Sequence, residues 1–447
     1  MLHLMDRGLH FPPPTALQPK TLIRLAGVFA AAAPALLIGF DAFSNYPWIP
    51  FDDPAIAYMQ RAPNDRVARL QQQIETGAVK LRYDEKHGYL PDLLKRLDIN
   101  TDSQMLVFSK TSFQAPRISP INPRALYFND DVLIGSVHNG EVLEVMALDP
   151  AQGVQFYSLD VHKSASPAFV RRDMACLQCH MSPATLNVPG LLVTSSYVST
   201  DGTPAFRGSQ QIVDHRTPLA ERWGGWYVNG TAGSLQHRGN SAAPDPSQPT
   251  AMEPIESGDQ TKLPKRVGTS VYLEPTSDIV ALLTLEHQTR MTNLMTRFGW
   301  ETRVATAGGK PDGFEKRLDE DATEMATYML FADEAKMRDP IAGVSTFTKT
   351  FAARGPRDQK GRSLRDFDLQ HRLFKYPLSY MIYSEAFDKM PDLLKDRVYR
   401  KLYDVLTGKD TSPTFARLSP EDRRNVMEIL LDTKAGLPGY WREPSSD

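Results

Sequence analysis

The chain has 447 residues, of which 41% are hydrophobic and 23% charged, and its formal net charge is −2 at pH 7. This composition is ordinary for a globular protein, and the length suggests two or three domains. The near-neutral charge gives no reason to expect a nucleic acid as partner. Only two cysteines are present, which excludes a framework of several disulfides.

The amino-terminal residues have the pattern of a targeting segment. Arg7, Lys20 and Arg24 precede an apolar run over residues 25–40. A basic flank before such a run predicts an export signal or a membrane anchor over residues 1–48, with cleavage left open; the alternative is a buried helix. The remainder of the chain is therefore expected in the periplasm, or anchored to the membrane and facing the periplasm.

Residues 49–163 predict a mixed α/β region. Asn64 and Asp65 can cap a helix that runs to about Thr76, and a second short helix is expected over Tyr89–Leu97. Asn139-Gly140 is a hairpin signal between two apolar runs. The expected strands are Met105–Ser109, Ala125–Phe128, Val132–Val137, Val142–Leu148 and Val154–Leu159.

The rest of the chain divides into two further regions. Residues 164–276 predict a loop-rich region with short strands, clearest at Leu191–Val198, Gly225–Val228 and Val267–Leu273. Residues 277–447 predict a helical region. There we expect Ser277 to cap a long helix, Pro391 to open a second that Gly408 stops, and Ser419 to open a third that Gly436 ends. The fold class is therefore α+β with a helical carboxy-terminal third.

The chemistry-bearing motif lies in the middle region. Cys176, Cys179 and His180 form Cys-x-x-Cys-His, the attachment signature of c-type haem. On one helical turn, both thiols can add to vinyl groups at one porphyrin edge, while His180 reaches the iron as proximal ligand. The sequence thus predicts one covalently attached haem c and makes residues 164–276 its binding region. A zinc site would need a second ligand pair, and a thioredoxin-like redox pair should follow a buried strand, whereas Arg171-Arg172-Asp173 precedes this one.

The second axial ligand of the iron is left open by the sequence. His237, in a Gly-rich loop after the aromatic stretch Trp223–Val228, is the leading candidate. His215 is flanked by charges and is expected at the surface, while His287 is expected as a hydrogen-bonded core residue on a helix. Met252, Met291 and Met295 are alternatives, the last two with core packing as their default interpretation.

A basic stretch over residues 354–365 is interpreted as a solvated loop. The alternative for this stretch is that it neutralises haem propionates or docks an anionic partner.

Several stretches resemble a family of large, exported, single-haem bacterial proteins that contain a cytochrome c domain. They are Ser109–Gln114, Tyr127–Asp131, Glu221–Val228, Leu285–Gln288 and Leu364–Asp368. The resemblance covers most of the chain after Trp48. It implies haem attachment and export, and it supplies no reaction.

These features favour an exported mono-haem cytochrome that transfers electrons to or from a respiratory partner protein. A haem-dependent oxidoreductase acting on peroxide or small oxyanions is the main alternative, because the chain is much longer than a simple carrier needs. A haem-based sensor or an assembly subunit is the third hypothesis.

Overall fold

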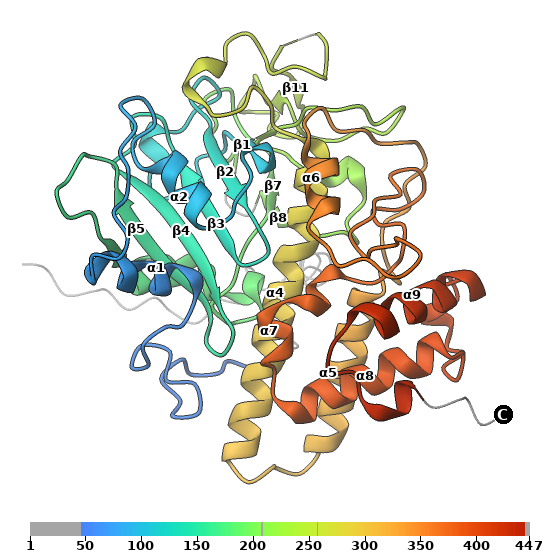
Figure 1. The fold of residues 1–447 in the computed structure, drawn as a ribbon. Coiled ribbons are helices and arrows are strands. Elements are labelled where there is room, and N and C mark those ends of the chain that lie inside the picture. The colour runs from blue at the N-terminus through green and yellow to red at the C-terminus, as the bar shows by residue number, and fades with distance from the viewer. Residues whose placement is uncertain (1–45, 207–208, 257, 443–447) are drawn as a thin grey trace, which may run out of the picture. The chain divides into compact units, whose positions relative to one another are not determined.

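A seven-stranded antiparallel sheet forms the centre of the amino-terminal half, in the order β6-β5-β4-β3-β2-β1-β9 (Figure 1). The structure is a computed structural model, and it describes residues 46–206, 209–256 and 258–442. The first five strands fall where alternating apolar side chains predict them. The strands are β1 (Met105–Val107), β2 (Arg124–Phe128), β3 (Val132–Ser136), β4 (Val142–Asp149), β5 (Gly153–Asp160), β6 (Phe169–Arg171) and β9 (Trp226–Tyr227).

The two faces of the sheet pack against different helices. Alternate residues such as Val145 and Tyr157 join a core cluster with α1 (Arg66–Glu75) and α2 (Leu90–Arg96). The caps of α1 follow the prediction, since Asp65 accepts the backbone N–H groups of Val67 and Ala68. Phe156 of β5 lies on the opposite face. There β5 contacts α3 (Asp173–His180) and the long helix α4 (Ile279–Ala307).

The middle region is loop-rich with short strands, as predicted. It contains α3 (Asp173–His180), the paired strands β7 (Thr194–Ser196) and β8 (Gln210–Ile212), and the pair β10 (Ser241–Ala242) and β11 (Glu253–Pro254). The strand expected over Val267–Leu273 is wrong, because this segment folds into a 3₁₀ turn over Thr269–Val271. Val267 and Tyr272 are buried individually against the core cluster and need no strand partner.

The carboxy-terminal third is helical, and α4 (Ile279–Ala307) is its longest element. Asp278 caps α4, rather than the expected Ser277, whose hydroxyl instead donates to the carbonyl of Tyr227. Helix α9 begins with the expected capping box of Ser419 and ends at Thr433, before Gly436. The other helices are α5 (Phe314–Met329), α6 (Phe347–Ala353), α7 (Glu385–Asp388), α8 (Asp392–Leu406) and α9 (Pro420–Thr433).

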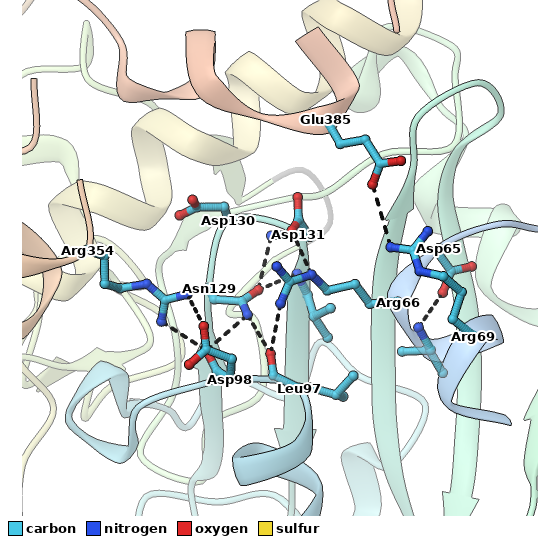
Figure 2. A network of polar contacts seen from close by, with 12 residues as sticks. Asp65, Arg66, Arg69, Leu97, Asp98, Asn129, Asp130, Asp131, Arg354 and Glu385 are labelled. Atoms are coloured by element: carbon cyan, nitrogen blue, oxygen red, sulfur yellow. Dashed lines mark hydrogen bonds and ion pairs between the residues drawn. The ribbon is translucent and has the colours of Figure 1, made fainter. Parts of the chain in front are cut away.

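The basic stretch over residues 354–365 is a loop whose middle is exposed, as interpreted, while both of its ends are held by ion pairs. Arg354 pairs with Asp98 at 2.8 Å (Figure 2), and Arg365 pairs with Asp130. Asn129 donates to the carbonyl of Leu97 in the same network. The stretch therefore joins the helical third to the turn between β2 and β3.

The predicted export signal or anchor at residues 1–48 lies almost wholly outside the described residues. From Trp48 onward the chain forms one compact unit. Within the described ranges, no helix is long and apolar enough to cross a membrane.

Candidate functional site

Helix α3 carries the whole Cys-x-x-Cys-His motif. Residues three and four positions apart lie on one side of a helix, so the side chains of Cys176, Cys179 and His180 leave α3 on the same side. Cys179 is exposed and Cys176 is half-buried, whereas Leu177 is buried. The helix is thus anchored by Leu177, and Cys179 lies at the protein surface.

The imidazole of His180 is held by one hydrogen bond and one aromatic contact. Its Nδ1 lies 2.8 Å from the carbonyl oxygen of Gly190, and since a carbonyl can only accept, Nδ1 carries the proton. The Phe156 ring lies 5.0 Å from the imidazole, centroid to centroid. Burial lowers the pKa of His180, which favours the neutral ring. A neutral ring protonated on Nδ1 presents its Nε2 lone pair, as a metal-ligating histidine must.

The loop that accepts this hydrogen bond is fastened on both sides. The Gly190 N–H donates back to the carbonyl of His180 at 2.9 Å. On the other side, the buried side chain of Asn293 in α4 accepts the N–H of Leu191 and donates to the Leu191 carbonyl, both at 2.9 Å. A methyl group on Gly190 would lie 2.3 Å from Asn293 Oδ1, so the loop passes α4 at a distance that only glycine permits.

These residues fit a covalently attached haem. The two thiols and the imidazole have the helical spacing that attachment requires, and the His180 tautomer is the one that leaves Nε2 for iron. Nearby, the positive charge of Arg124 contributes to the lowered pKa of His180. The guanidinium of Arg124 pairs with Glu144 at 2.7 Å, and its Nε is buried with no partner in the described part of the chain.

The competing interpretations of the motif fit less well. Among the described residues, no group of three or more His, Cys, Asp or Glu side chains could hold a metal ion, as a zinc site would require. A strand does precede the motif, contrary to the expectation from Arg171-Arg172-Asp173, but β6 is an edge strand and Val170 is exposed. The Cys176 N–H already donates to Arg172 within the helix, so it is not free to stabilise a thiolate as at a helix start.

His237, the leading candidate for the second axial ligand, contacts Trp223 and Gly239 in its own region. Its ring lies 5.1 Å from that of Trp223, and its Nδ1 accepts the Gly239 N–H at 3.1 Å. Burial lowers the pKa of His237 to about 4, so the ring is neutral and carries its proton on Nε2. Ligation through Nε2 would require that proton to move and the Gly239 bond to break. His237 therefore stays a prediction.

The other candidate ligands lie in the core. His215 is buried, so its expected surface position is wrong, and its Nδ1 lies 2.8 Å from Nδ1 of His287. His287 is the hydrogen-bonded core residue that was expected, with Nε2 2.7 Å from the Ser379 hydroxyl. Met291 and Met295 are also buried in α4, in line with their default interpretation, and Met252 packs against the core cluster.

No family model, no curated protein and no solved structure matches this chain.

Proposed function

We propose that this protein is an exported mono-haem c-type cytochrome that exchanges electrons with a partner protein of a respiratory chain. The observation that carries the proposal is the arrangement of α3. The side chains of Cys176, Cys179 and His180 leave it on one side, and Cys179 is exposed. The Nδ1–H of His180 donates to the Gly190 carbonyl. A haem supplies a one-electron couple, and the protein holds it and tunes its potential.

The position of α3 supports electron transfer over chemistry in a closed chamber. The exposed Cys179 and the exposed Met174 place this helix at the protein surface. A porphyrin edge bonded to a surface helix is accessible to a docking partner, whereas a substrate chamber would need to be enclosed by side chains. Export, and a site on the periplasmic side, follow from the amino-terminal pattern and belong to the same proposal.

Covalent attachment tests the proposal directly. The full chain, made in a host that matures c-type cytochromes, is expected to keep its haem mass after denaturation and to give a c-type pyridine haemochrome spectrum. Cys176→Ala with Cys179→Ala should lose both signals, while the matched variant Met174→Ala on the same helix should keep them. A wild-type chain with only its polypeptide mass would overturn the proposal. Binding of carbon monoxide to the reduced protein would overturn the carrier role alone.

A further inference from the structure

We infer that Asn293 is a positioning residue for the proximal ligand His180, acting through the loop at Gly190 and Leu191. This inference rests on the proposed function, because it concerns how the chain tunes a bound haem. Asn293 lies on α4, 102 residues beyond Leu191, and it is almost fully buried. It is thus a core side chain that bonds the loop following the Cys-x-x-Cys-His motif.

The first step is the geometry of the clamp. Both polar atoms of the Asn293 amide bond to one residue, with Oδ1 accepting the Leu191 N–H and Nδ2 donating to the Leu191 carbonyl. Such paired bonds fix the orientation of the two peptide groups that flank the Cα atom of Leu191, as the paired bonds between strands do. The peptide bond that joins Gly190 to Leu191 contains both the Leu191 N–H and the Gly190 carbonyl, so Asn293 fixes the direction of that carbonyl.

The second step leads from the carbonyl to the imidazole. The Gly190 carbonyl accepts the Nδ1–H of His180 at 2.8 Å. A hydrogen bond at Nδ1 makes Nε2 a stronger donor to a metal and fixes the rotation of the ring. A stronger donor stabilises ferric iron over ferrous iron, so the clamp is expected to lower the reduction potential of the haem.

The glycine provides an independent way to disturb the same clamp. A Cβ at Gly190 would lie 2.3 Å from Oδ1 and 2.9 Å from Cγ of Asn293, so Gly190→Ala must displace the loop or the amide. Asn293→Ala removes the clamp from the other side. Asn293→Leu removes both hydrogen bonds, keeps a similar side-chain volume and adds no charge.

The experiment measures the midpoint potential of the purified haem-loaded protein. Asn293→Ala, Asn293→Leu and Gly190→Ala should each raise it, and a tenfold loss in the relative stabilisation of ferric iron corresponds to about 59 mV for a one-electron couple. The control is Thr302→Val, since this buried hydroxyl on α4 donates only to the Phe298 carbonyl. Its potential should match that of the wild type.

The outcomes separate this inference from the proposed function. If the wild type carries haem and the folded Asn293 and Gly190 variants keep its potential, Asn293 has a structural role only, and the inference is overturned while the proposed function stands. A lowered melting temperature with an unchanged potential would overturn the inference in the same way. If the wild type carries no haem, the proposed function fails, and this inference fails with it.

Discussion

His215 and His287 lie side by side in the core, with their Nδ1 atoms 2.8 Å apart and one proton between them. The surroundings indicate which ring donates. Ser379 lies 2.7 Å from Nε2 of His287, and Asp333 lies 3.7 Å from Nε2 of His215. A proton on Nε2 of His215 faces the carboxylate, so His287 donates through Nδ1 and accepts the Ser379 hydroxyl at Nε2. Both rings are neutral in this arrangement.

We expect this pair to make the fold sensitive to acid. Burial lowers the pKa of both rings, most strongly for His287, although Asp333 and Asp214 act in the opposite direction. A base with a depressed folded-state pKa contributes its full stability above the unfolded value of about 6.5 and loses it as the pH falls. Each ring then lowers the free energy of unfolding by up to about 1.4 kcal/mol for each pH unit below 6.5.

The measurement is the free energy of unfolding in urea at pH 7.5 and pH 5.5. His287→Gln should reduce the loss between these two pH values relative to the wild type, even where it lowers stability at both. His371→Gln is the control, since His371 is exposed, and it should keep the wild-type difference. An equal pH dependence in the wild type and His287→Gln would contradict the prediction.

A buried ion pair lies beside the histidines and should be costly to break on one side only. Arg222 donates to Glu286 at 2.7 Å, and both side chains are buried. Burial raises the pKa of Glu286 to about 7, while Arg222 opposes that shift. Glu286→Ala leaves the Arg222 charge without its carboxylate and should cost about 3–5 kcal/mol of unfolding free energy.

Chemical denaturation of a double variant tests this account of the pair. Arg222→Met with Glu286→Leu should recover much of the stability lost in Glu286→Ala, since two apolar side chains need no charge partner. A double variant as unstable as the single one would show that the loss comes from packing rather than from the uncompensated charge.

Between about pH 4 and pH 8 the chain should lose stability as the pH rises, through a carboxyl pair between α4 and α5. Burial, and then the neighbouring Glu301, raise the pKa of Asp321 to about 8. The unfolded chain ionises near pH 4 and the folded one near pH 8, so unfolding becomes easier as the pH rises between these values, by at most about 1.4 kcal/mol per unit. Asp321→Asn should flatten the stability profile between pH 6 and pH 8. An unchanged slope in urea titrations would refute this.

The distal ligand can be tested by one substitution. If His237 is the second axial ligand, His237→Ala should convert a low-spin haem spectrum to a high-spin one, because the variant removes the imidazole. Trp223→Phe, which alters the neighbouring ring, is the matched control. An unchanged spectrum in His237→Ala would remove His237 as the ligand, in line with the Gly239 N–H that donates to its Nδ1.

Much of the fold follows from local patterns in the sequence. Alternating apolar residues predict the long strands, and capping residues such as Asp65 and Ser419 predict helix starts. The three-residue strand β6 is too short to show an alternation of apolar residues, and it forms by antiparallel pairing with β5. Helix α5 was not predicted individually, because no side chain caps its start, although its buried Phe314, Leu318 and Ala322 have helical spacing.

The candidate site is predictable only as far as it is local. Cys176, Cys179 and His180 are read from five consecutive residues. The burial of His215 was missed because its neighbours Asp214 and Arg216 suggest a surface, whereas they pair with each other at 2.7 Å. The contact of Asn293 with Leu191 spans 102 residues and has no sequence signal beyond a polar residue in an apolar helix.

That separation along the chain has a consequence for the order of assembly. The bond between His180 and Gly190 closes a loop of ten residues and can form early, whereas the bond from Asn293 requires α4 to be made and docked. Under the proposed function, export with the amino terminus leading would present the thiols to the attachment machinery before α4 fixes the loop that holds the imidazole. Docking of α4 would then fix the orientation of the His180 ring last, after the haem has been attached to both cysteines.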